Sequence, residues 1–323
     1  MHMADALISP QVGLTMTALT AGLLGYSIKK AKSTFDSERT PLMGLLGAFV
    51  FAGQMLNFAI PATGSSGHIS GAILLASILG ASRAFIVMAC ILAIQALFFA
   101  DGGILALACN IFNLGFWACF IAYPLILKPA LKNGFSKAKV IITTILACIV
   151  SAQLGSFCVV LETLLSGQSQ LSFTTFASLM QGIHLAIGAI EGVATALLLL
   201  FLHQVKPSLF DKEINSKELS YKSVFAIIAL ASVVLSSMLS LYASSSPDGL
   251  EWSIEKTTSE ELVYESQSHE LSSSLAEVAP MPDYNVGAGE ESWRASLAGF
   301  LGTALSLAII YILSVALFRK RKA

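Results

Sequence analysis

Apolar residues fill most of the chain in long runs that short polar stretches separate. A helix needs about 20 mostly apolar residues to cross a bilayer. The third run is short and close to the fourth, so residues 68–100 also fit a re-entrant or tilted segment buried among other helices. We predict an all-α integral membrane protein with nine transmembrane helices, at roughly residues 10–29, 40–60, 68–82, 84–100, 104–127, 138–165, 173–203, 223–243 and 293–318.

The positions of Lys and Arg predict the orientation of these helices. Cytoplasmic loops of membrane proteins are enriched in both residues. With the N-terminus outside and nine crossings, seventeen of the nineteen basic residues fall on the inner side, and only Lys256 and Arg294 fall outside. The sequence therefore predicts an extracytoplasmic N-terminus and a cytoplasmic C-terminus.

A polar stretch at residues 206–222 divides the chain into two blocks. Residues 1–205 contain seven of the predicted helices, and residues 223–323 contain two helices joined by the loop 244–292. This loop is Ser-rich and acidic, which is typical of a solvated segment. We interpret residues 206–222 as a cytoplasmic linker at which two polypeptides are fused.

The composition agrees with a membrane protein, because only 12% of the residues are charged and the mean hydropathy is +0.75. Soluble domains carry about 25% charged residues. The five cysteines lie inside apolar runs without a CxxC pair, so we expect small buried residues and neither zinc ligands nor disulfides. The chain has no G-x-x-x-x-G-K-[ST] phosphate loop, so transport that uses ATP needs an ATPase on another chain.

The chain starts MHMADALISP, which places a terminal amine next to a histidine. This start lacks the basic region of a secretory signal, and the large residue after Met1 predicts that Met1 is retained. Chelation by the Met1 amine, the His2 amide nitrogen and the His2 imidazole would close a five-membered and a six-membered ring in one plane. Planar nitrogen sites favour Cu(II) or Ni(II), and affinity should fall at low pH. The alternative is an ordinary solvated terminus.

Three further side chains are candidates for metal chemistry. His68 lies in the Gly/Ser-rich loop 61–72 at the predicted outer face, where it either supplies a fourth nitrogen or simply bonds the backbone. His184 and Glu191 are seven residues apart on one face of the predicted seventh helix. Ionisable residues within a membrane are functional candidates, although such a pair can also pin helices together.

Several polar residues within or beside the predicted helices have two possible roles. They either glue neighbouring helices by hydrogen bonds or orient ligating histidines. These residues are Gln54, Asn57, Ser66, Gln95, Asp101, Asn110 and Asn113.

One different function class has a motif in its favour. The string GSSG at residues 64–67 matches the G-x-S-G string of rhomboid-type intramembrane serine proteases, with Ser66 as nucleophile and His184 as its base. Such strings are common in loops, and this interpretation leaves the Met-His start unexplained.

Five motifs, in order, resemble one family. MHMADALISP, GSSGHISGA (64–72), ALFFADGGILALACNIFN (96–113) and IHLAIGAIEGVATA (183–196) resemble motifs of the substrate-binding components of nickel and cobalt energy-coupling factor transporters, the CbiM/NikM family. PDGLE (247–251) resembles the motif of the small accessory N component, fused here to the first block. Ala4 and Ala6 depart from the family's Pro and Gly, but neither position is a ligand.

The resemblance implies a transport subunit and no enzyme. The transported substrate would be Ni²⁺ or Co²⁺, bound by the Met1 amine, the amide and imidazole of His2, and His68. A planar nitrogen site favours nickel, and the alternative is cobalt uptake for cobalamin biosynthesis. The implied partners are a transmembrane coupling (T or Q) subunit and cytoplasmic ATPases. We expect a multi-pass protein of the prokaryotic plasma membrane and no nucleic-acid partner.

Overall fold

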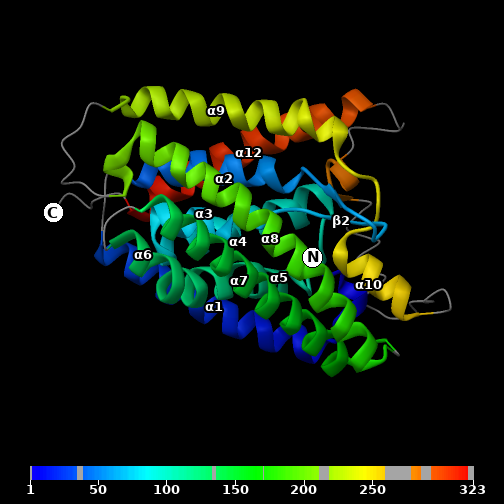
Figure 1. Ribbon diagram of the computed structural model, residues 1–323. Coiled ribbons are helices and arrows are strands. Elements are labelled where there is room, and N and C mark those ends of the chain that lie inside the picture. The colour runs from blue at the N-terminus through cyan, green and yellow to red at the C-terminus, as the bar shows by residue number, and fades with distance from the viewer. Residues whose placement is uncertain are drawn as a thin grey trace.

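The computed structural model describes residues 2–34, 39–132, 136–169, 171–210, 218–258, 278–284 and 292–318. Met1 and most of the predicted loop 244–292 lie outside the described residues. Within them the chain is a bundle of long helices that run alongside one another (Figure 1).

The described residues of the first block form nine helices of the bundle. The helix α1 begins at Pro10 after Ser9, whose side chain accepts a hydrogen bond from the Val12 N–H, and such a cap satisfies an otherwise unpaired helix donor. The nine helices are α1 (Pro10–Ser33), α2 (Arg39–Gln54), α3 (Ala72–Leu79), α4 (Ala81–Phe99), α5 (Leu107–Ile111), the π-helix η2 (Phe112–Leu127), α6 (Lys128–Lys132), α7 (Lys137–Ser166) and α8 (Phe173–Val205).

The second block adds helices on one side of the bundle. Its two long helices, α9 and α12, pack against α2 and against each other (Figure 1). Its elements are α9 (Tyr221–Ser237), η4 (Leu239–Tyr242), α10 (Gly249–Thr257), η5 (Pro282–Tyr284) and α12 (Ser292–Phe318). Two further short turns lie outside this block: η1 (Asp5–Leu7) in the first block and η3 (Pro207–Leu209) in the linker 206–222.

Six helices among the described residues are long and apolar enough to cross a membrane. They are 81–99, 107–131, 137–166, 173–205, 221–242 and 293–318. The other three predicted spans correspond to α1, α2 and α3, and α3 has only 8 residues, far short of the roughly 20 that a crossing needs. The all-α membrane architecture is therefore confirmed in outline, while the nine crossings and the orientation of the termini stay predictions.

A short β-hairpin interrupts the helical pattern and was not predicted. The strands β1 (Phe58–Ile60) and β2 (Ser65–Gly67) pair antiparallel, with Phe58 opposite Gly67. Ala62 and Gly64 in the connecting turn both have positive φ, which only a few residue types adopt readily. Three-residue strands are too short to show the alternation of apolar and polar residues that predicts a strand.

The hairpin and the start of the chain lie at one end of the bundle. Figure 1 shows β2, α10 and the first residues of the chain gathered there, with α6 at the opposite end. The core between the helices contains fully buried aromatic rings, including Phe51, Phe85 and Phe99. This core fixes the ends of α2, α4 and α8, which carry the polar residues of the site.

Candidate metal-binding site

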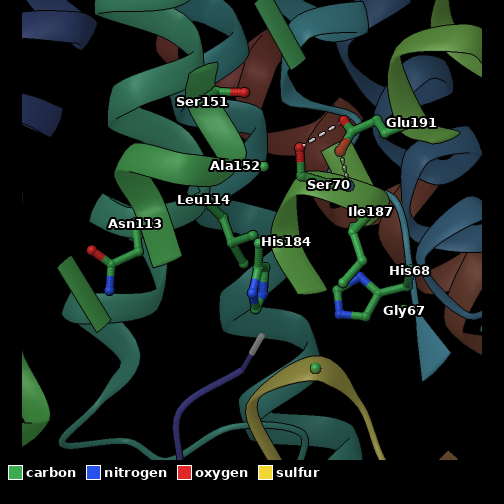
Figure 2. A pocket seen from close by; sticks show the side chains of 11 residues that line it. Gly67, His68, Ser70, Asn113, Leu114, Ser151, Ala152, His184, Ile187 and Glu191 are labelled. Carbon is green, nitrogen blue, oxygen red and sulfur yellow. Dashed lines mark hydrogen bonds between the residues drawn. The ribbon is translucent and has the colours of Figure 1, made fainter. Parts of the chain in front are cut away.

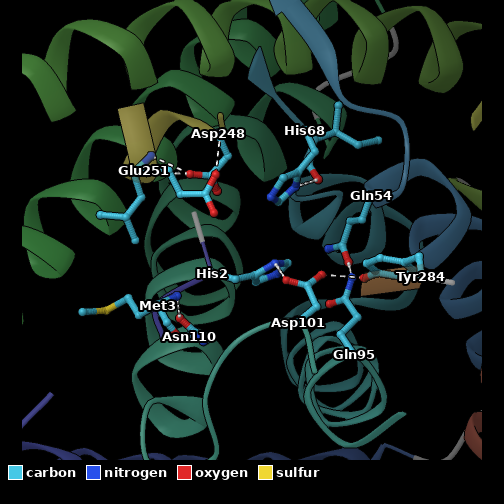
Figure 3. Close-up of polar contacts among 12 residues, drawn as sticks. His2, Met3, Gln54, His68, Gln95, Asp101, Asn110, Asp248, Glu251 and Tyr284 are labelled. Carbon is cyan, nitrogen blue, oxygen red and sulfur yellow. Dashed lines mark hydrogen bonds and ion pairs between the residues drawn. The ribbon is translucent and has the colours of Figure 1, made fainter. Parts of the chain in front are cut away.

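The first residues of the chain run into the bundle because Asn110 on α5 holds the main chain of Met3. The Met3 N–H donates to Asn110 Oδ1 at 2.8 Å, and Asn110 Nδ2 donates to the Met3 carbonyl at 3.1 Å. The same carbonyl accepts from the Gly103 N–H at 3.0 Å, and the Met3 side chain is fully buried. This double contact places His2 inside the protein (Figure 3).

Two consecutive glycines make room for this segment. A Cβ atom on Gly103 would lie 1.7 Å from Asp5 Oδ1, and one on Gly102, which has φ +87°, would lie 2.9 Å from Asn110 Nδ2. The Asp5 carboxylate accepts from the Ile104 N–H at 3.1 Å and from the Ala106 N–H at 2.9 Å. The ADGG string therefore docks the start of the chain, a role that the sequence did not indicate.

The His2 ring lies between an acidic side chain and a second imidazole. His2 Nδ1 is 2.8 Å from Asp101 Oδ1, and the ring stacks on His68 with a centroid distance of 5.0 Å and an interplanar angle of 21°. His2 Nε2 is buried and has no hydrogen-bond partner in the described part of the chain. The structure thus brings together the two histidines predicted to bind metal, and Met1 lies outside the described residues.

Asp101 is held in its charged form by its neighbours. Its other carboxylate oxygen accepts a hydrogen bond from the Tyr284 hydroxyl, and the Tyr284 ring stacks on Phe99. Burial alone would raise the pKa of Asp101, but the charge of His2 and the hydrogen bonds from His2 and Tyr284 lower this pKa overall to well below its usual range. A fixed negative charge therefore lies beside the two imidazoles.

His68 is neutral and has a defined tautomer. Its Nδ1 lies 3.1 Å from the Ile69 carbonyl, and because a carbonyl oxygen only accepts, Nδ1 carries the proton and Nε2 the lone pair. Burial lowers the pKa of His68 to about 3. A neutral imidazole is the form that binds divalent transition metals.

Glu191 on α8 holds the loop that carries His68. Its carboxylate accepts from the Ser70 N–H at 3.0 Å, the Ser70 hydroxyl at 2.8 Å and the Gly71 N–H at 2.9 Å (Figure 2). Gln54 Nε2 donates to the Ser70 carbonyl at 2.8 Å, and Gln95 Nε2 donates to Gln54 Oε1 at 2.9 Å. The His68 loop is thus held in place by hydrogen bonds with Glu191 and Gln54, and Gln95 in turn holds Gln54.

The predicted solvated loop contains a helix that covers the site. Asp248 caps α10, because its Oδ1 accepts from the Leu250 and Glu251 N–H groups at 2.8 and 2.9 Å, and Glu251 accepts in return from the Asp248 N–H. Trp252 Nε1 donates to the Thr63 carbonyl in the hairpin turn at 3.0 Å. The PDGLE motif therefore docks beside the histidines and is no free loop, a tertiary contact that local sequence does not reveal.

Ser66 joins the hairpin to the PDGLE segment. Its hydroxyl donates to the Ser246 carbonyl at 2.7 Å, and its N–H donates to the Pro247 carbonyl at 2.8 Å. Farther along, the main-chain carbonyl of Asn57 accepts from the Ser244 N–H at 2.8 Å. These contacts hold the segment around Ser246 next to β2.

A cavity of about 460 Å³, the outer cavity, lies between the two blocks. Among the described residues no three His, Cys, Asp or Glu side chains are arranged to hold a metal by themselves. The polar residues that line the outer cavity are His2, Gln54, Asn57, His68, Asp101, Ser240, Ser246, Asp248, Glu251, Asp283 and Tyr284.

Comparison with known proteins supports a role in metal transport. Residues 2–209 match the family described as the cobalt uptake substrate-specific transmembrane region, and residues 222–319 match the PDGLE domain. A relative from Haloquadratum walsbyi, provisionally named a metal transport protein, is 31% identical over 68% of this chain and 98% of its own. A relative from Archaeoglobus fulgidus, provisionally named a fused nickel transport protein, is 28% identical over 72% of this chain and 75% of its own.

A solved structure shares the fold of the first block. The crystal structure of a truncated transition metal transporter is 32% identical to this chain, with a TM-score of 0.55, and covers 63% of this chain and 99% of its own. The fold and these matches define a multi-pass component of a transition-metal transport system in the prokaryotic plasma membrane. The chain belongs to the family of cobalt uptake substrate-specific transmembrane components and carries a PDGLE domain behind that region.

The protease interpretation of GSSG is wrong. The relatives and the matching fold are transporter components and not enzymes. The Ser66 hydroxyl donates to the Ser246 carbonyl, and the only hydrogen bond of the His184 ring within the described residues joins Nδ1 to the Met180 carbonyl. Ser66 therefore lacks the hydrogen-bonded base that would activate it.

Proposed function

We propose that the chain is the substrate-specific subunit of an energy-coupling factor transporter that imports Ni²⁺. The ligands are the Met1 amine, the His2 amide nitrogen, His2 Nδ1 and His68 Nε2. The observation that carries this proposal is the stacking of His2 on His68 at 5.0 Å beside the carboxylate of Asp101. A neutral His68 and the nearby negative charge of Asp101 together favour a divalent cation.

Metal binding exchanges one partner of His2. The six-membered chelate ring with the His2 amide closes only through Nδ1, and Nδ1 contacts Asp101 in this structure. The ring must therefore leave Asp101 Oδ1 when the ion binds. Asp101 remains close enough to balance the charge of the bound cation, because the Tyr284 hydroxyl holds its other oxygen.

Nickel is the favoured substrate because four nitrogens in one plane suit Ni(II). The relative from Archaeoglobus fulgidus is named a fused nickel transport protein, and its name thus describes a fusion, as proposed for this chain. Cobalt is the second candidate, because the family that matches residues 2–209 is described by cobalt uptake. Nickel content and cobalt content of purified protein decide between them.

Transport requires other subunits in this proposal. The sequence has no phosphate-binding loop, so a transmembrane coupling subunit and cytoplasmic ATPases would supply the energy. The proposed orientation places the histidines at the outer face, where the ion is captured, and release occurs towards the cytoplasm.

A one-residue extension tests the ligand set directly. Adding an Ala before Met1 moves the terminal amine one residue away from its place beside His2, and His2→Ala removes the imidazole ligand. We expect both variants to lose high-affinity Ni²⁺ binding in calorimetric titration of protein with an untagged N-terminus. His203→Ala, which changes a histidine on the far part of α8, serves as the control. Unchanged Ni²⁺ affinity in the extended variant would refute the terminal chelate.

A further inference from the structure

A second, smaller cavity lies on the other side of His68. It has a volume of about 30 Å³ and is lined by residues of α8, η2 and the His68 loop (Figure 2). Among the described residues, His68 alone lines both this inner cavity and the outer cavity. The side chain proposed as the last ligand of the outer site therefore separates two chambers.

The inner cavity contains an imidazole nitrogen without a partner. His184 Nδ1 lies 2.8 Å from the Met180 carbonyl, which only accepts, so Nδ1 carries the proton and Nε2 the lone pair. His184 is 2% exposed, and its Nε2 has no hydrogen-bond partner within the described residues. Metal-binding histidines are commonly prepared in this way, with one ring nitrogen donating to a carbonyl and the other facing the metal.

Asn113 provides a second buried atom that could bind a metal in the same cavity. Its Nδ2 donates to Glu162 Oε2 at 2.6 Å, while its Oδ1 is buried and has no partner in the described chain. Buried polar atoms are rarely left unpaired, because each one costs free energy. Two such atoms, on His184 and Asn113, line one cavity next to a proposed metal ligand.

We propose that His184 Nε2 and Asn113 Oδ1 form an inner station for the transported cation. The ion passes to it from the outer site when His68 turns from one cavity to the other. This proposal rests on the proposed outer site and adds a step behind it. The ligand class is a divalent first-row metal ion, for which imidazole nitrogen and an amide oxygen are suitable donors.

Size and charge agree with one ion in transit. A volume of about 30 Å³ holds one or two waters, so the ion would enter with little of its hydration shell. Glu191 lines the cavity, and Glu162 bonds the amide of Asn113, so two carboxylates lie close to the station. Their oxygens would offset part of the cost of a cation in a low-dielectric interior. A site with two protein donors binds weakly, as passage requires.

The other explanation is that His184 only pins helices together. Its bond to Met180 lies within α8 and joins no second helix. A helix-pinning role would also leave Nε2 without a function, whereas the inner station uses it. The ring also contacts α10 at Gly249, where a Cβ would lie 3.2 Å from His184 Cε1, but this packing contact makes no use of Nε2.

Uptake of radioactive Ni²⁺ by the complete transporter in proteoliposomes tests the station. His184→Phe keeps a planar ring and removes Nε2. We expect its maximal uptake rate to fall at least tenfold, while its half-saturating Ni²⁺ concentration and its equilibrium Ni²⁺ affinity stay within twofold of wild type. His184→Cys should recover part of the rate because a thiolate also binds metal, and Asn113→Leu should lower the rate severalfold. Ile187→Val, in the same cavity wall, is the control.

Three results would overturn the inner station. They are wild-type uptake by His184→Phe, loss of equilibrium binding by His184→Phe to the extent seen in His2→Ala, and uptake by His184→Cys no faster than by His184→Phe. Thermal melting checks that each variant is folded, and uptake is compared at equal amounts of folded protein. Binding that survives in His2→Ala would instead refute the outer site, so the two proposals fail separately.

Discussion

Three histidines in this protein use Nδ1 in the same way. His2 Nδ1 contacts Asp101, His68 Nδ1 contacts the Ile69 carbonyl, and His184 Nδ1 contacts the Met180 carbonyl. In His68 and His184 the carbonyl partner places the proton on Nδ1 and the lone pair on Nε2. For His68 and His184 this tautomer suits metal binding as it stands, whereas His2 must release Asp101 before Nδ1 can join the proposed chelate.

Asp101 should set the metal affinity through its charge. Asp101→Asn keeps the size of the side chain and removes the negative charge beside the site, and groups around the ligands of a metal are typically worth 10–100-fold in affinity. We therefore expect the Ni²⁺ affinity to fall by about that factor, measured by calorimetric titration. Asp283→Asn, at the mouth of the same cavity, should change it far less. Equal or tighter binding by Asp101→Asn would contradict this role.

Gly103 should be intolerant of a side chain. A Cβ there would lie 1.7 Å from Asp5 Oδ1, so Gly103→Ala must move the first residues of the chain away from the site. We expect Ni²⁺ affinity to fall at least tenfold in titration. Gly22→Ala, where a Cβ meets nothing within 4 Å, is the matched control and should bind like wild type. Normal binding by Gly103→Ala would show that the docked segment is dispensable.

Acid should weaken the fold through His68. The folded protein resists protonation of His68 until its pKa of about 3, whereas the unfolded chain takes up that proton near the ordinary pKa of about 6.5. As pH falls from about 6.5 towards 3, the unfolded state binds the extra proton and stability is lost. The melting temperature of metal-free protein should therefore drop less between pH 7 and pH 5 in His68→Gln than in wild type. An equal drop would contradict the low pKa.

At the scale of elements, the sequence predicted the long helices and missed the short ones. The apolar runs that became α4, α7 and α8 are long enough to be unambiguous. The hairpin of β1 and β2 and the helix α10 are set by mutual contacts, such as the Trp252 bond to the Thr63 carbonyl. The Asp248 and Glu251 pair does match a capping box, so a helix start could have been recognised there.

The packing of α10 on α8 should depend on Gly249. A Cβ at this position would lie 3.1–3.2 Å from atoms of Ile183, His184 and Ile187, and overpacking typically costs about 1–3 kcal/mol. Gly249→Val should lower the melting temperature and make residues 244–258 more sensitive to protease. Gly182→Val, at an open position of α8, should leave the protease pattern unchanged. An unaltered pattern in Gly249→Val would argue against this contact.

At the scale of the whole molecule, both blocks build one site. His2, His68 and Asp101 come from the first block, whereas Asp248, Glu251 and Tyr284 come from the second. The sequence indicates His2 and His68 as ligands, and Asp101 as a residue that either joins helices or orients ligating histidines. Tyr284 was not identified, because it is 183 residues from Asp101 and nothing local marks its role. The boundary at residues 206–222 stays a prediction.

Separating the blocks should show what the second one contributes. A chain that ends at residue 205 loses the Tyr284 hydrogen bond to Asp101 and the cover formed by α10. We expect metal uptake in cells to fall strongly on deletion of residues 206–323. Co-expression of residues 206–323 as a second chain should restore much of it, since α2, α9 and α12 share an extensive packed surface. Full uptake by the shortened chain would show that the PDGLE block is not needed for loading.

The hydrogen bonds between Asn110 and Met3 set the position of the start of the polypeptide. They involve main-chain atoms of Met3, so they fix how many residues precede it without regard to their side chains. Under the proposed chelation, enzymes that deformylate, acetylate or trim nascent proteins would then decide whether a given copy can carry nickel. The ability of each copy to take up metal would therefore be decided during protein synthesis, before the chain meets its substrate.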